Sequence, residues 1–226
     1  GLAHEQNPAF RPSLQVEYAS QDEQGQGRLA LDVTGHTDPG ISYEASANWY
    51  FGQKATERDR LIREFRGALA YRDKEASQHV VLAQYLGRSY LLGVHEGFTP
   101  ATKTVHAGLL EWGYVINEDL TVTAQGAARF STEKAEDEAD HKSSIYLGQL
   151  GAEYRLYSDY TLGVFARMLA DSHKVSRNGF AVELSRRMTE DLSLAVGYSS
   201  LDLDDPDLST LVDWPSSLYL RLRMKF

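Results

Sequence analysis

Apolar and polar residues alternate along most of this chain with a period of two residues. Residues 119–130 show the pattern over a long stretch, where one set of alternate positions is apolar: Leu120, Val122, Ala124, Gly126, Ala128 and Phe130. The intervening positions are mostly polar: Thr121, Thr123, Gln125, Ala127 and Arg129. Successive side chains of a strand point to opposite faces of a sheet, so the pattern predicts a long strand with one apolar face.

The same test applied to the whole sequence predicts twelve strands. Their ranges are 14–20, 28–36, 41–51, 62–73, 79–93, 104–116, 119–131, 142–157, 159–171, 175–188, 191–202 and 217–226. Short connections between successive strands favour antiparallel pairing. The expected fold class is therefore all-β, an antiparallel transmembrane β-barrel of about twelve strands, provided that the apolar face can be shown to face lipid.

The predicted connections alternate in length along the chain. Joins at 117–118, 158 and 189–190 are tight and those at 37–40 and 74–78 are short, whereas 52–61, 94–103, 132–141, 172–174 and 203–216 are mostly longer and more polar. Outer-membrane barrels have short periplasmic turns and longer extracellular loops. The sequence therefore predicts a periplasmic N-terminal segment or linker at 1–13 and a barrel at 14–226, with both ends on the short-turn side.

Composition excludes several classes of protein. No stretch approaches the roughly 18 apolar residues that a membrane helix needs, and alternating strands can span a bilayer although only 42% of the residues are hydrophobic. The chain has no cysteine, so we expect neither a disulfide framework nor a thiolate metal site. A net charge of −9 argues against a nucleic-acid partner. Residues 1–5 lack the features of a signal peptide, which suggests a mature chain.

Aromatic residues decide whether the apolar face meets lipid or a soluble core. On the apolar face they gather toward both strand ends. Those at the short-turn end are Tyr43, Tyr71, Trp112, Tyr114, Tyr154, Tyr160 and Phe226, and those at the loop end are Trp49, Phe51, Phe65, Phe130, Tyr146, Phe180 and Tyr198. Two such girdles are typical of membrane barrels, because amphipathic rings favour the headgroup level. The sequence therefore predicts a membrane barrel rather than a soluble one.

The opposite face of the predicted strands carries charges of both signs. The acids are Glu17, Asp32, Glu44, Glu64, Glu111, Glu153 and Glu183. The bases are Arg28, Arg66, Arg72, Arg88, Arg129, Arg155, Arg167, Arg187, Arg221, Arg223 and Lys225, which exceed the acids by four. In a membrane barrel these residues line the lumen, where they either pair or meet water.

The last strand carries a resemblance to a known class of protein. Residues 218–226 alternate apolar and polar positions up to the terminal Phe226, and they resemble the closing strand of Gram-negative outer-membrane β-barrel proteins. The resemblance implies an outer-membrane location, contact with outer-membrane lipid and lipopolysaccharide, and Phe226 as the signal for the barrel-assembly machinery. Residues 191–226 also look like the C-terminal barrel of some large bacterial surface proteins. Size and strand count are similar to those of small twelve-stranded porins for acidic sugars.

The candidates for catalysis and metal binding are weak. His141 and Ser143 have the His-x-Ser spacing of the outer-membrane phospholipase, but a catalytic serine needs a third group to orient its histidine, and position 153 is Glu rather than Asn. A hydrolase at the barrel rim stays a remote alternative, and no catalytic residue is predicted. The remaining histidines lack metal-ligand spacing, so we expect no metal and no cofactor.

Two acidic stretches are expected to be exposed. Residues 133–140 read as a solvated loop tip. The second stretch contains Asp202, Asp204, Asp205 and Asp207 but lacks the glycine and terminal glutamate of a calcium-binding loop. It is predicted to be a flexible acidic loop.

The inner charges leave two functions open. Charges that line a water-filled lumen would give a passive channel for small anionic solutes, whereas charges that interlock would plug the barrel and make it the membrane anchor or translocator of a larger surface protein. The excess of bases favours the channel. We therefore expect anion selectivity that is weakened by reversing the charges of Arg221 and Arg223.

Overall fold

The computed structural model describes residues 10–21, 24–37, 40–51, 60–72, 78–92, 101–134, 139–172, 175–189, 192–215 and 217–224. These residues form twelve strands and one short 3₁₀ helix. The strands are β1 (Arg11–Gln21), β2 (Gln24–Thr37), β3 (Ile41–Phe51), β4 (Arg60–Arg72), β5 (His79–Leu91), β6 (Thr102–Val115), β7 (Leu120–Lys134), β8 (His141–Tyr157), β9 (Tyr160–Asp171), β10 (Ser176–Arg187), β11 (Leu192–Ser199) and β12 (Ser217–Met224), and the helix is η1 (Leu208–Thr210). The all-β class and the number of strands are therefore confirmed.

Each strand pairs antiparallel with its neighbour in the sequence, in the order β1 to β12. The register keeps residues of one alternation set side by side: Val122 lies opposite Ala152, and Thr123 lies opposite Gly151. Among the described residues no pairing joins β12 to β1, so closure of the barrel stays a prediction. The predicted barrel start at residue 14 falls inside β1, which begins at Arg11.

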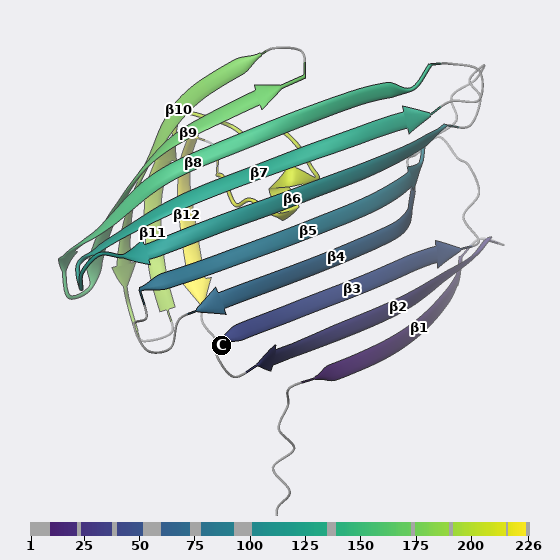
Figure 1. Cartoon of the computed structure of the whole chain (residues 1–226), viewed down its shortest axis with the longest axis horizontal. Helices are drawn as coiled ribbons and strands as arrows, with labels where there is room; N and C mark the ends of the chain where they lie inside the picture. The colour runs from purple at the N-terminus through teal and green to yellow at the C-terminus, as the bar shows by residue number, and fades with distance from the viewer. Residues whose placement is uncertain are drawn as a thin grey trace, which may run out of the picture.

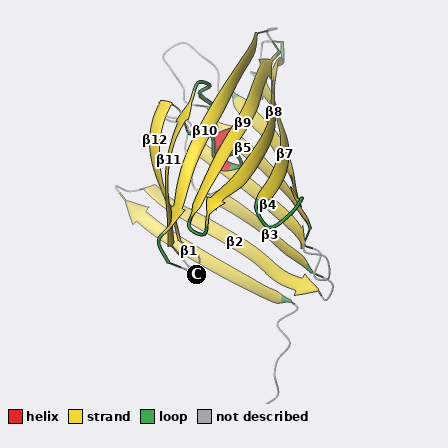
Figure 2. Cartoon of the chain, turned by 90° about the vertical axis from the view of Figure 1, so that its left-hand side faces the viewer, coloured by secondary structure: helices red, strands yellow, loops and turns green. Residues whose placement is uncertain are grey.

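The sheet curls strongly along its length. Figure 1 shows β10, β11 and β12 behind the plane formed by β4 to β8, and Figure 2 shows η1 inside the curve. The sheet therefore has an outer, convex face and an inner, concave face. Within the described part of the chain, no helix is long and apolar enough to cross a membrane.

Short connections gather at one end of the strands, which we call the turn side, and the opposite end is the loop side. In the turn between β6 and β7, the Asn117 side-chain oxygen accepts hydrogen bonds from the backbone N–H groups of Asp119 and Leu120, at 3.0 and 2.9 Å. Before β3, Gly40 has a φ of 97°, a left-handed conformation that favours glycine. Most residues of the predicted loops 52–61, 94–103 and 132–141 lie outside the described residues or within strands.

Burial is inverted relative to a soluble protein. On the outer face, Leu150 is 67% exposed and Leu220 is 74% exposed. On the inner face, Arg167 is only 7% exposed and Glu183 only 6%. A soluble barrel buries its apolar face, so this arrangement requires an apolar medium around the sheet.

Strand β11 is shorter than predicted by several residues. Residues 191–202 read as a continuous strand, but β11 ends at Ser199. The Ser199 hydroxyl donates to the Leu201 carbonyl at 2.8 Å and accepts from the Leu201 N–H at 3.4 Å, within a stretch that leaves the ladder. The chain then turns onto the inner face.

Candidate functional site

The segment between β11 and β12, residues 200–215, folds into the concave side of the sheet, and we call it the inward segment (Figure 2). The sequence predicts a flexible acidic loop here, and that prediction is wrong. Asp205 and Asp207 are 6% and 3% exposed, although Asp202 and Asp204 are exposed as expected. The alternation of apolar and polar residues stops before this segment. The sequence therefore has no period here from which the burial of its side chains could be predicted.

Apolar contacts hold the inward segment against one wall of the lumen. Its side chains Leu201, Leu208, Val212 and Trp214 form one buried cluster with inner-face residues of β5 to β9. Those partners are Leu86, Ala107, Leu109, Ala127, Leu147 and Leu169. Apolar residues at inner-face positions are unusual for a polar lumen, and here they have a partner inside the barrel. The segment therefore occupies part of the lumen, beside β5 to β9.

Buried ion pairs fix the acidic part of the inward segment. The Asp207 carboxylate accepts hydrogen bonds from Arg88 Nη1 at 3.1 Å and from the Tyr90 hydroxyl at 3.0 Å. Arg88 also donates to Glu64, at 2.8 Å. Arg129 Nε lies 3.2 Å from Asp205 Oδ2. Buried carboxylates need such partners, because an unpaired buried charge is strongly unfavourable.

A short capping motif shapes the segment locally. The Asp205 side chain accepts from the backbone N–H groups of Asp207 at 3.1 Å and Leu208 at 2.9 Å, at the start of η1. Aspartate in this position supplies acceptors for N–H groups that have no partner within a helix. Residues 205–207 therefore form a turn in addition to supplying the two carboxylates of the buried ion pairs.

A cavity of about 240 Å³, which we call the central chamber, lies between the inward segment and the strands. The Trp214 indole N–H donates to Gln125 Oε1 at 3.0 Å, and Gln125 Nε2 donates to Glu111 at 3.1 Å. The Arg167 guanidinium lies over the Trp214 ring, 4.8 Å from its centroid. The chamber therefore combines an aromatic surface with fixed polar groups of both signs.

Arg221 is held on the far side of the same chamber. Its guanidinium donates to Glu183 at 3.0 Å and lies 3.0 Å from Asp213 of the inward segment. Tyr219 donates to the same Glu183 oxygen at 3.0 Å. Arg221 is thus engaged by two carboxylates, which makes it a poor residue for testing ion selectivity, contrary to the sequence-based choice.

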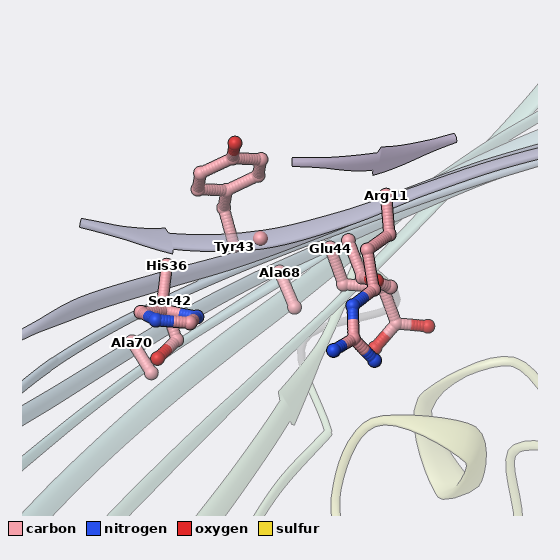
Figure 3. Close-up of a pocket in the computed structure, with 9 residues that line it drawn as sticks. Arg11, His36, Ser42, Tyr43, Glu44, Ala68 and Ala70 are labelled. Atoms are coloured by element: carbon pink, nitrogen blue, oxygen red, sulfur yellow. The ribbon is translucent and has the colours of Figure 1, made fainter. Parts of the chain in front are cut away.

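A second cavity, of about 460 Å³, lies against β1 to β4 near the turn side. Figure 3 shows Arg11, His36, Ser42 and Glu44 on one side of the sheet, with Tyr43 pointing to the opposite side. A smaller cavity of about 160 Å³ lies between Glu44, Arg66 and the inward segment. Space therefore remains beside the inward segment.

Bases without acidic partners gather at the turn side of the inner face. Arg72, Arg155 and Arg187 are exposed, and none of them forms an ion pair within the described part of the chain. Arg66, by contrast, pairs with Glu64 at 2.9 Å. Of the other predicted inner bases, Lys225 and the side chain of Arg223 lie outside the described residues, as does Phe226.

The aromatic residues lie on the outer face and meet in pairs, some across neighbouring strands and one within β6. At the loop side the pairs are Trp49 with Phe65, Phe130 with Tyr146, and Phe180 with Tyr198, with ring centroids 5.7, 5.7 and 6.0 Å apart. At the turn side Trp112 stacks on Tyr114 at 5.9 Å, and the Arg186 guanidinium lies over Tyr160. Tyr71 and Tyr154 are exposed. Rings therefore occur near both ends of the outer face.

The residues considered for catalysis serve other contacts. The Ser143 hydroxyl is bonded to Ser131 at 2.8 Å and accepts from Arg129 at 2.9 Å. It therefore takes part in the network around Arg129. No group of three or more His, Asp or Glu side chains within the described residues could hold a metal ion.

Comparison with solved structures finds likeness to porins. No family model and no curated protein sequence matches the chain. A solved NanC porin is 14% identical, with 95% of this chain and all of that chain covered and a TM-score of 0.49. A KdgM porin in complex with disordered oligogalacturonate is 14% identical, with 84% and 91% covered and a TM-score of 0.37. At this level of identity the likeness assigns no function to this chain.

Proposed function

We propose that this chain is a bacterial outer-membrane barrel that acts as a passive channel for small anionic solutes. The observation that carries the proposal is the inverted burial, with apolar side chains exposed around the outside and charged side chains enclosed on the concave face. Membrane barrels need that order, because lipid surrounds them and only their lumen is polar. Aromatic rings near both ends of the outer face match the two membrane interfaces.

The lumen supports passage because the apolar cluster of the inward segment packs against β5 to β9, while open space remains beside β1 to β5. A cavity of about 160 Å³ remains between that segment and β3 to β5, and one of about 460 Å³ lies against β1 to β4. Arginines that form no ion pair with any described residue lie around the turn side and give this mouth a positive field, which raises the local concentration of anions. In this proposal the turn side is periplasmic, the terminal Phe226 is read by the barrel-assembly machinery, and lipid and lipopolysaccharide surround the outer face.

We expect the purified protein to need detergent or lipid and to migrate differently on a gel when it is not heated. The exposed apolar face would otherwise drive association in water, and hydrogen-bonded barrels commonly resist detergent until they are heated. Circular dichroism should show a β-rich spectrum. A monodisperse, folded protein in plain buffer would contradict the membrane location.

In a planar bilayer, the wild-type protein should give discrete conductance steps and a reversal potential on the anion-selective side. Reversing the charge at two unpaired positions, Arg155→Glu with Arg187→Glu, should move the reversal potential toward cation selectivity, because both side chains are exposed at the turn-side mouth. The double variant Arg155→Lys and Arg187→Lys keeps the charge and is the matched control. Unchanged selectivity in the glutamate variant would rule out these bases as the selective element.

The inward segment favours a second function, that of a plugged anchor. Its buried cluster with Leu86, Leu109 and Leu147 fills the lumen beside β5 to β9. A bilayer that stays silent in the presence of folded protein would support this anchor and would exclude the channel.

A further inference from the structure

The central chamber contains a carboxylate that is fixed in position without a basic partner. Gln125 Oε1 accepts from the Trp214 indole, so the Gln125 amide must present its NH₂ group to Glu111, 3.1 Å away. Glu111 is half-buried and forms no ion pair within the described residues. A neutral amide orients this carboxylate but does not cancel its charge.

The bases around the chamber are already engaged. Arg221 lies between Glu183 and Asp213, at 3.0 Å from each. Arg167 covers the Trp214 ring and donates to Gln149 at 2.7 Å and Ser199 at 2.8 Å. Neither guanidinium is therefore available to neutralise Glu111, and both are held in place by several contacts.

A buried hydroxyl adds an unused polar group to the same wall. Thr123 lines the chamber, and its Oγ1 atom is buried with no hydrogen-bond partner among the described residues. A buried hydroxyl without a partner is costly unless a bound group satisfies it. Thr123 and Glu111 lie on neighbouring strands, β7 and β6. The wall therefore offers the Glu111 carboxylate to a small ligand, whereas Thr123 Oγ1 is closed to solvent.

We propose that the central chamber receives the ammonium group of a solute that also carries an anionic group. The inference rests on the proposed channel and refines its substrate class: among small solutes with an anionic group, the chamber favours those that also carry an ammonium group. Glu111 attracts the cationic group at the chamber. Arg72, Arg155 and Arg187, which have no ion-pair partner among the described residues, favour the anionic group at the turn-side mouth. A solute with negative charge alone meets an unfavourable carboxylate at the chamber.

Uptake of three solutes that differ by one group tests this proposal. Serine is the zwitterion, glycerate replaces its ammonium group with a hydroxyl, and 2-amino-1,3-propanediol replaces its carboxylate with a hydroxymethyl group. Full-length protein in liposomes should admit serine faster than either analogue, by about two- to fivefold, which is the effect of one partly exposed charge pair. Glu111→Gln should abolish this preference for serine over glycerate, because the side chain keeps its shape and loses its charge.

Glu118→Gln is the matched control, since Glu118 is an exposed carboxylate in the turn between β6 and β7 and does not line the chamber. It should leave the preference unchanged. Equal uptake of all three solutes, or an equal preference in wild type and Glu111→Gln, would overturn the chamber proposal while the channel stands. Absence of uptake of every solute by correctly folded protein would overturn both.

Discussion

Replacing Asp207 with alanine should lower the free energy of unfolding by about 3–5 kcal/mol, the usual effect of removing one member of a buried charge pair. Its carboxylate joins Arg88 at 3.1 Å and Tyr90 at 3.0 Å, and it lies 3.9 Å from Arg129. The side chains of Asp207 and Arg88 are 4% and 11% exposed. The substitution leaves Glu64 as the acidic partner of Arg88 and removes one of the ion pairs that attach the inward segment, while the pairs Asp205–Arg129 and Asp213–Arg221 remain.

Urea unfolding in detergent micelles, followed by the gel-mobility difference between folded and unfolded protein, measures this effect. Asp204→Ala is the control, because Asp204 belongs to the same acidic stretch but is exposed. Its effect should stay within about 0.5 kcal/mol. Equal stability of the two variants would show that Asp207 is not held inside the barrel.

The strands could be predicted from the sequence because one force acts on every residue of a membrane barrel. Lipid demands an apolar side chain at each outward position, and the pleat places these positions two residues apart. The range predicted for β3, residues 41–51, agrees with the structure, and the prediction for β8 differs by one residue. Errors appear at β11, where the Ser199 side chain turns the chain away from the ladder.

The inward segment could not be placed by the same reasoning, because it has no period. Two signals in the sequence are consistent with it. Leu86, Leu109 and Leu147 occupy inner positions where a wet lumen would favour polar residues, and Leu208, Val212 and Trp214 interrupt a stretch otherwise rich in aspartate. The inner-face leucines cannot be matched to the apolar residues of the inward segment from the sequence alone, because contacts between distant segments depend on how the sheet curls.

The same limit applies to the charges of the lumen. Counting strand residues alone predicts an excess of bases, but Asp205, Asp207 and Asp213 of the inward segment pair with Arg129, Arg88 and Arg221. The positive field is therefore confined to the turn-side mouth. Which arginine has a partner is a property of the folded lumen. Because Arg221 is paired with Glu183 and Asp213, Arg155 and Arg187 are the better positions for testing selectivity.

Arginine at an outer mid-strand position should destabilise the barrel far more than arginine at an inner position. Val164 lies on the outer face of β9 and is 49% exposed, so Val164→Arg places a guanidinium in the hydrocarbon region. The expected loss is about 2–4 kcal/mol near the bilayer midplane. Gln84 on β5 faces the cavity that Glu44 and Arg66 also line. An arginine at this position can be hydrated and can approach a carboxylate, so Gln84→Arg should lower the free energy of unfolding by less than about 1 kcal/mol.

Unfolding in lipid vesicles measures both variants, whereas micelles weaken the distinction because the side chain reaches water more easily. The difference between the two positions should therefore shrink in detergent and grow in a thicker bilayer, since the depth of Val164 sets the penalty. A soluble protein with an inverted pattern would show no dependence on bilayer thickness. Equal losses of unfolding free energy for Val164→Arg and Gln84→Arg in vesicles would mean that the outer face of β9 does not meet lipid. That result would contradict both the outer-membrane location and the channel.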